Sequence, residues 1–158
     1  MIRRPPRSTL DRSSAASDVY KRQTKIDYTD QKEINMRVVL KSKIHRAWVT
    51  DANPDYVGSI LIDEDLMDKV DIWNFEKVLI CDVTNGNRFE TYAIAGERGS
   101  GVCSVQGAAA HLVAKQDCLI IMSFDVTNEP VDPQMILVDQ DNRFVEFLEG
   151  AKHVQQVH

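Results

Sequence analysis

The sequence predicts a mainly β fold, a small closed barrel with two or so short helices. From residue 36 onward, about seven or eight short runs are rich in β-branched and aromatic side chains, which favour strands. Clusters of Asp, Asn, Gly and Pro separate these runs at short intervals and predict turns. So many strands in roughly 120 residues favour a closed barrel, because closure removes the exposed edges of a sheet.

The predicted elements follow one another without a long linker. The predicted strands are residues 36–50, 58–62, 76–83, 88–95, 102–106, 117–124, 135–138 and 144–148. The predicted short helices are residues 63–70 and 107–114. Asp63 is the expected cap of the first helix. The cluster 51–56 predicts a turn. Asn85-Gly86 predicts a type I′ hairpin turn, which needs positive φ at both central residues.

Composition and charge exclude several classes of protein. The formal net charge is −5, so coating of nucleic acid or of an acidic membrane is not expected. No apolar run approaches the ~20 residues of a transmembrane helix. The cysteines Cys81, Cys103 and Cys118 are odd in number and widely spaced. This spacing indicates neither a disulfide framework nor a zinc site, and it favours reduced thiols in a cytoplasmic protein.

The first residues differ from the rest of the chain. Residues 1–23 closely resemble the conceptual translation of a sequencing adapter, and 24–35 would be translated leader before a natural start at Met36. A transit peptide is the alternative, but its amphipathic helix fits poorly with the acidic residues and the paired prolines present. The predicted division is residues 1–35 for a spurious, disordered extension, 36–148 for the barrel domain and 149–158 for a flexible tail.

Three short segments hold the candidate chemistry. They are Lys43-Ile44-His45-Arg46 with Tyr56-Val57-Gly58-Ser59 downstream, the run from Asn85 to Tyr92, and the run from Val105 to His111. Alone, each has an ordinary interpretation as a turn, a hairpin or a helix start. By itself, Arg88 would be a solvated charge and Tyr92 an aromatic of the barrel wall. His45 and His111 are expected to be structural or hydrogen-bonding groups rather than acid–base catalysts.

In this order and at this spacing, the segments resemble the bacterial pyruvoyl-dependent L-aspartate 1-decarboxylase family. The resemblance runs from about residue 36 to 124, with a weaker match to about 148. It implies a double-ψ β-barrel and a homotetramer of processed α and β chains. The cytoplasmic location, and the lack of a metal, nucleic acid or membrane partner, are expected from the composition and residue spacing instead. The resemblance also implies conversion of L-aspartate to β-alanine and CO₂ through a Schiff base with a pyruvoyl group, for pantothenate biosynthesis.

The resemblance further implies a zymogen that cuts itself between Gly58 and Ser59, with Ser59 becoming the pyruvoyl cofactor. The chemistry requires such a group, because decarboxylation leaves an electron pair that a carbonyl can accept. Ser59 Oγ would attack the Gly58 carbonyl, where glycine has no Cβ and tolerates strained backbone angles. Donors must stabilise the oxyanion, and the family pattern assigns the Thr91 hydroxyl to this step.

The same pattern assigns the substrate contacts. Arg88 is expected to hold one carboxylate with its planar fork, and Lys43 the other. Tyr92 would protonate Cα as general acid. The remaining expected contacts are Thr91, Gly107, Ala108 and Ala109. Adjacent strand residues such as Thr91 and Tyr92 point to opposite faces, so both serve one site only at a bend or a subunit seam.

One position departs from the family pattern. Gln106 stands where the family usually has Asn, and its extra methylene moves the amide by about 1.5 Å. Slower self-processing, or reliance on a maturation helper, is the hypothesis that follows. His45, Tyr56 and Gln106 are expected to surround the site without binding substrate.

Two alternatives stay open at this point. One is a non-catalytic double-ψ barrel that binds a small acid or a partner protein. The other is a pyruvoyl decarboxylase for another amino acid. Having both Ser59 and Tyr92 argues against the first, and having both Arg88 and Lys43 favours a diacid substrate over a basic one.

Overall fold

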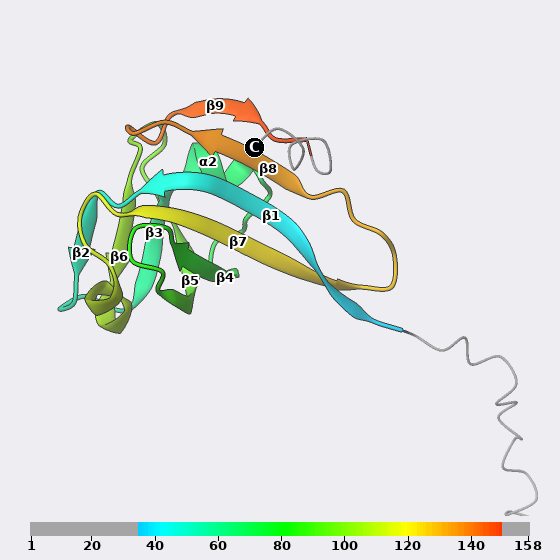
Figure 1. Cartoon of the computed structure of the whole chain (residues 1–158), viewed down its shortest axis with the longest axis horizontal. Helices are drawn as coiled ribbons and strands as arrows, with labels where there is room; N and C mark the ends of the chain where they lie inside the picture. The colour runs from blue at the N-terminus through cyan, green and yellow to red at the C-terminus, as the bar shows by residue number, and fades with distance from the viewer. Residues whose placement is uncertain (1–34, 150–158) are drawn as a thin grey trace, which may run out of the picture. The chain divides into compact units, whose positions relative to one another are not determined.

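The computed structural model describes residues 35–149, and this part of the chain is mainly β, as predicted (Figure 1). Its elements are β1 (Arg37–Trp48), β2 (Asp51–Asn53), β3 (Ser59–Asp63), helix α2 (Glu64–Lys69), β4 (Lys77–Asp82), β5 (Arg88–Gly96), β6 (Cys103–Gln106), the 3₁₀ helix η2 (Gly107–Leu112), β7 (Cys118–Thr127), β8 (Gln134–Val138) and β9 (Phe144–Phe147). The predicted extension, apart from Asn35, and the predicted tail, apart from Glu149, lie outside the described residues. No helix within the described range has the length and apolarity to cross a membrane.

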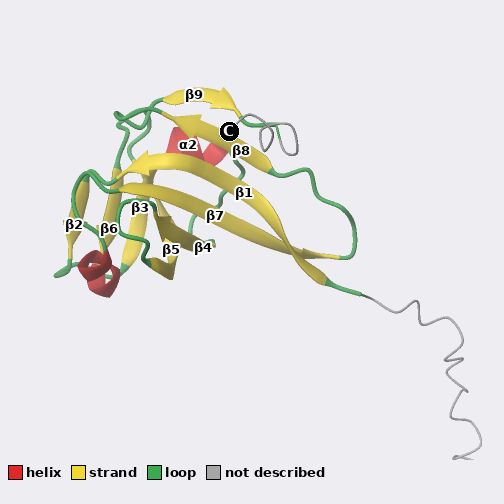
Figure 2. Cartoon of the chain, viewed as in Figure 1, coloured by secondary structure: helices red, strands yellow, loops and turns green. Residues whose placement is uncertain are grey.

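The strands form one curled sheet in the order β2-β6-β3-β5-β4-β7-β1-β8-β9 (Figure 2). The long strands β1 and β7 pair antiparallel, whereas β3 with β5, β2 with β6, and β1 with β8 pair in parallel. The hydrogen-bonded order is open, with β2 and β9 at its edges. The mainly β, barrel-like prediction is confirmed, and sheet curvature rather than a complete ring of hydrogen bonds encloses the core.

One hydrophobic core fills the concave side of this sheet. Strand β4 shows the reason, because its buried and less buried residues alternate along the strand with period two. The largest fully buried side chains of the core are Ile44, Ile60, Ile62, Met67, Ile80, Leu119, Ile121 and Ile136. Most are β-branched residues that the sequence places in strands, so the runs that predict strands also supply the core.

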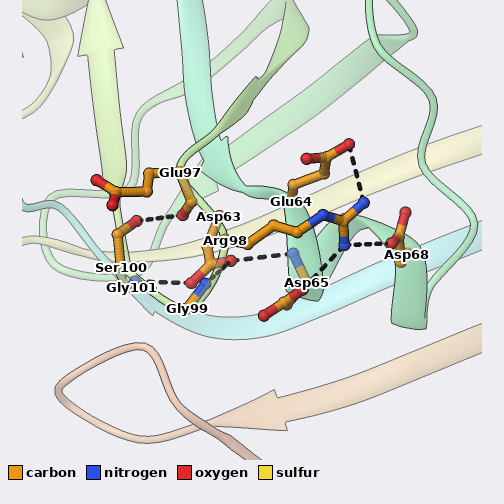
Figure 3. Close-up of polar contacts among 9 residues, drawn as sticks. All are labelled: Asp63, Glu64, Asp65, Asp68, Glu97, Arg98, Gly99, Ser100 and Gly101. Carbon is orange, nitrogen blue, oxygen red and sulfur yellow. Dashed lines mark hydrogen bonds and ion pairs between the residues drawn. The ribbon is translucent and has the colours of Figure 1, made fainter.

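Helix α2 begins as the sequence predicts. Asp63 is its N-cap, and Asp63 Oδ1 accepts a hydrogen bond of 3.0 Å from the Asp65 backbone N–H. The same carboxylate, only 2% exposed, also accepts hydrogen bonds from the Gly99 and Gly101 N–H groups (Figure 3). Arg98 forms ion pairs with three carboxylates of the helix, those of Glu64, Asp65 and Asp68. These contacts fix the loop that leads from β5 into β6.

Two local predictions are wrong. Residues 51–53 form strand β2 rather than only a turn, because their backbone pairs in parallel with β6. The loop between β4 and β5 is no type I′ turn, since Gly86 has φ of 82° but Asn85 is not among the residues with positive φ. The Asp82 carboxylate organises this loop instead, by accepting hydrogen bonds from the Thr84 and Asn85 N–H groups.

Candidate active site

The predicted cleavage junction lies where β3 begins. Ser59 pairs with Gln106 across the antiparallel strands β3 and β6. The Ser59 side chain is buried, with the residue only 3% exposed, and its Oγ donates a 3.0 Å hydrogen bond to Gln106 Oε1. The hydroxyl of the expected nucleophile is therefore buried and hydrogen-bonded at the start of β3.

A second glycine packs directly on the junction. Gly107 has φ of 70°, and a Cβ there would lie 2.5 Å from Gly58 Cα and 2.8 Å from the Gly58 nitrogen. Only glycine fits this close approach of the η2 backbone. Gly58 itself has φ outside the left-handed region, and a Cβ there would make ordinary contacts at 3.7 Å and beyond. The backbone strain expected at Gly58 is therefore not found in its φ angle, and the left-handed glycine of the junction is Gly107.

Strand β5 runs beside the junction. Its parallel pairing with β3 begins at Ile60 and Ala93, so Ser59 and Tyr92 each come one residue before this first pair. Ala93 is fully buried, so Thr91 shares its inward face, and Tyr92 points to the other. The Tyr92 ring packs on Phe75, with 6.3 Å between ring centroids. The two candidate residues thus lie next to the junction but on opposite faces of β5, as predicted.

The two candidate substrate-binding cations lie on different strands. Arg88 is exposed at the start of β5, and Lys43 is partly exposed on β1, which β5, β4 and β7 separate from β3 in the sheet order. Neither forms an ion pair with any residue of 35–149, whereas Lys41, Lys77 and Arg98 do. Both cations are therefore available to an anion. No described contact joins either of them to Ser59 within one chain.

The other predicted site residues occupy mixed environments. Gly107 is buried, Ala109 is partly buried and Ala108 is exposed, so the first turn of η2 presents a small, open surface next to the junction. Tyr56 is 59% exposed, and its carbonyl oxygen lies 3.1 Å from the position that a Gly107 Cβ would take. His45 is half-buried on β1.

The chain resembles known proteins. A family described as aspartate decarboxylase matches residues 35–145. The aspartate 1-decarboxylase of Acetivibrio thermocellus is 50% identical over 119 residues, which cover 73% of this chain and 94% of the relative. The enzymes of the same name from Clostridium botulinum strains 657 and Langeland are 53% and 52% identical, with the same coverage.

The chain belongs to the aspartate decarboxylase family. The family resemblance inferred from the three segments is confirmed. So is the prediction of an enzyme, because an aspartate 1-decarboxylase is a carboxy-lyase. The roles of individual residues stay predictions that rest on the geometry above.

The described residues bear on two further predictions, that the chain has no zinc site and that its cysteines are reduced. Among residues 35–149, no group of three or more His, Cys, Asp or Glu side chains could hold a metal ion. Cys103 and Cys118 are buried, Cys81 is half-buried, and all three are free thiols. Burial raises the pKa of the Cys103 thiol to about 12, which keeps it protonated and unreactive.

One cavity lies away from the predicted site residues. It has a volume of about 460 Å³ and includes the ion pair between Lys41 and Glu76. Its other lining residues are Asp71, Trp73, Asn74, Phe75, Phe124 and Asp125. None of the predicted site residues is among the residues that line it, and its Phe75 ring packs on the Tyr92 ring. This cavity is therefore separate from the residues of the candidate active site.

Sequence reasoning missed two residues near this site. Asn85 and Asn87 both donate side-chain hydrogen bonds to the carbonyl oxygen of Leu112, at 3.1 and 2.7 Å. They connect the loop that carries Arg88 with the end of η2. The sequence analysis includes both in the segment from Asn85 to Tyr92, as part of a predicted hairpin turn and of the family resemblance, but assigns neither a role at the site.

Proposed function

We propose that the chain cuts its own backbone between Gly58 and Ser59 and then decarboxylates L-aspartate at its α-carboxylate, giving β-alanine and CO₂. A pyruvoyl group derived from Ser59 would be its cofactor. The observation that carries this proposal is the burial of Ser59, the residue directly after Gly58. Its Oγ is hydrogen-bonded to Gln106 Oε1 at 3.0 Å. The relatives named aspartate 1-decarboxylase supply the substrate.

The proposed self-cleavage begins at the Ser59 hydroxyl. Ser59 Oγ attacks the carbonyl carbon of Gly58, the C–N bond breaks, and the freed nitrogen takes the hydroxyl proton. Elimination follows: a base takes the Ser59 Cα proton, the Cβ–O bond breaks, and the Gly58 carboxylate leaves. The resulting enamine gains a proton at Cβ to become an imine, and water converts the imine into the pyruvoyl carbonyl and ammonia.

The residues around the Gly58–Ser59 bond suit the formation of the pyruvoyl group. Gln106 orients the attacking hydroxyl through its hydrogen bond. The close contact of Gly107 with Gly58 limits movement of the scissile peptide, and such positioning contributes a large part of the rate of an intramolecular reaction. Thr91, on the inward face of the neighbouring strand β5, is the proposed donor to the oxyanion.

In the processed enzyme, a pyruvoyl group supplies the electron sink that loss of CO₂ requires. The chain's own residues bind the substrate carboxylates and protonate the substrate Cα. Arg88 binds one carboxylate of the substrate through two parallel hydrogen bonds, and Lys43 pairs with the other. Tyr92 donates a proton to Cα after CO₂ has left. The small residues of η2 leave room for the substrate next to residue 59.

We extend the proposal to a homotetramer of processed α and β chains with sites between protomers. Two observations support it. Lys43 and Arg88 make no described contact with Ser59 within one chain. Large apolar side chains are also exposed near the start of β1 and the end of β7. Val38 is 71%, Phe124 41% and Val126 58% exposed. An exposed apolar surface of this kind favours association with another chain. The cytoplasm and the supply of β-alanine for pantothenate are the proposed setting.

The direct test is product formation. Purified protein is incubated with L-aspartate, and β-alanine is measured by chromatography, with Ser59→Ala as the matched variant and L-glutamate and L-lysine as other substrates. We expect β-alanine from aspartate alone, and none from Ser59→Ala. Product from another amino acid would indicate a different pyruvoyl decarboxylase. An uncut protein that binds aspartate without turnover would indicate a binding module.

A further inference from the structure

Two side-chain amides tie the Arg88 loop to η2. Asn87 Nδ2 donates a 2.7 Å hydrogen bond to the Leu112 carbonyl oxygen, and Asn85 Nδ2 donates one of 3.1 Å to the same atom. Leu112 is the last residue of η2, and Asn87 directly precedes Arg88. The contacts therefore join two elements that the proposed function assigns to the substrate, the strand start with Arg88 and the helix that begins at Gly107.

A buried pair of carboxylates lies under this junction. Asp82 is 3% and Asp117 8% exposed. Asp82 Oδ2 accepts a 2.8 Å hydrogen bond from Asn85 Nδ2, and Asp117 Oδ2 lies 3.5 Å from the same nitrogen. Asp117 also accepts a 2.6 Å hydrogen bond from the Ala114 N–H, just beyond η2. The Asn85 amide thus lies between both acids and the end of η2.

The loop has little freedom of its own. Asn85 Oδ1 accepts a 2.8 Å hydrogen bond from the Asn87 N–H, and the Asp82 N–H donates one of the same length to the Asn87 carbonyl oxygen. Across the strands, Thr84 Oγ1 accepts from the Cys118 N–H at 2.9 Å. The Arg88 side chain, by contrast, is exposed and makes no ion pair within 35–149. Rigidity is concentrated in the backbone before Arg88, and its guanidinium stays available.

We propose that Asn85 and Asn87 are positioning residues for substrate binding, which hold the backbone of Arg88 at a fixed place relative to η2. The proposal rests on the proposed function, because it needs Arg88 to bind a carboxylate. The ligand class is a short dicarboxylate. A fixed guanidinium matters because bidentate binding needs both N–H groups aligned, and displacements of about 1 Å can cost up to about 100-fold.

The test compares Asn87→Ala and the isosteric Asn87→Asp with the wild-type protein. The aspartate replaces an N–H donor with an oxygen that the Leu112 carbonyl repels. Thr127→Ala is the matched control, because it removes an exposed side-chain hydrogen bond to a backbone N–H far from Arg88. For each protein, the cleaved fraction, the KM and kcat for L-aspartate, and the Kd for succinate by calorimetry are measured. Succinate has both carboxylates but no amine, so its binding needs no turnover.

We expect both Asn87 variants to be cleaved like wild type, with kcat within about twofold. Their KM and succinate Kd should rise by roughly tenfold or more, whereas Thr127→Ala should match wild type in all four measurements. Unchanged succinate affinity in Asn87→Asp would overturn the proposal. So would a loss of kcat and cleavage with unchanged KM, since that indicates a merely structural role. If the wild-type protein forms no β-alanine but binds succinate, and Asn87→Asp weakens that binding, the proposed function is overturned and this inference is kept.

Discussion

The cleavage junction and the two substrate cations differ in how completely one chain builds them. At the junction, Ser59, Gln106 and Gly107 come from neighbouring elements, with a 3.0 Å hydrogen bond and backbone atoms in direct contact. The cations Arg88 and Lys43 lie on separate strands and form no ion pair among the described residues. The Ser59 hydroxyl is buried and hydrogen-bonded within one chain, whereas the two cations have no ion-pair partner among the described residues.

This difference matches the two reactions that we propose. Self-cleavage is intramolecular, so its groups must be in place as soon as one chain has folded. Substrate binding needs charges that stay available, and a second chain can complete that site later. The comparison predicts that variants at the junction block maturation, whereas variants at the cations spare maturation and impair turnover.

The largest effect is expected for Gly107→Ala. Its Cβ would lie 2.5 Å from Gly58 Cα, so the junction must shift, and cleavage should slow by about 100-fold or more. Gly99→Ala is the control, because Gly99 also has positive φ but would make only an ordinary contact of 3.7 Å. Time courses of cleavage on denaturing gels measure both. Equal rates for the two variants would show that the contact with Gly58 does not matter.

Arg88→Gln should be cleaved normally but lose activity. It removes a charged, bidentate partner of the substrate, and hydrogen bonds to charged groups are worth about 1.5–3 kcal/mol each. We expect kcat/KM for L-aspartate to fall by roughly 100-fold. Arg37→Gln, which removes an exposed cation at the start of β1, should have little effect. If Arg88→Gln failed to cleave itself, the claim that the cations serve substrate binding and not maturation would be contradicted.

Gln106→Asn should change the cleavage rate by a smaller factor. The sequence hypothesis is that Gln106 slows processing, yet its Oε1 already lies 3.0 Å from Ser59 Oγ. A shorter side chain withdraws the amide by about 1.5 Å and loses this hydrogen bond, so we expect cleavage to slow by up to about tenfold. Faster cleavage of Gln106→Asn would instead support the sequence hypothesis.

The smallest effect concerns pH and stability. Burial raises the pKa of Asp82 above its ordinary value, and the neighbouring Asp117 adds to the shift. The folded state thus holds this proton more tightly than the unfolded state. The resulting stabilisation is present below the ordinary pKa of 3.8 and is lost as pH rises through the raised pKa.

Asp82→Asn removes this contribution, because its side chain does not titrate. Between about pH 4 and pH 7, its apparent midpoint of thermal unfolding should fall less than that of wild type. Asp141→Asn, at an exposed acid, serves as the control. Parallel pH profiles for wild type and Asp82→Asn would contradict the raised pKa of Asp82.

Much of the fold could be predicted from local pattern. Runs of β-branched residues locate the strands, and Asp63 before an acidic turn locates α2, because both signals act within a few residues. The sheet order could not be predicted, since it places β3 between β5 and β6, which come later in the chain. Strand β2 was missed for the same reason, because only its distant partner β6 makes it a strand.

The candidate site divides in the same way. The resemblance identifies Gly58, Ser59 and Arg88 by residue type and order. It does not show that Gly107 has positive φ and contacts Gly58, because that contact depends on how η2 folds back on β3. The Asn85 and Asn87 contacts with Leu112 were hidden as well, since they join residues 25 and 27 positions apart.

The central claim is that Ser59 becomes the cofactor, and the intact mass of the purified protein under denaturing conditions tests it most directly. We predict two fragments, one ending at Gly58 and one starting at residue 59 that is lighter than its encoded mass by one ammonia. A single uncut chain would contradict the claim, as would a fragment starting at residue 59 with its full encoded mass.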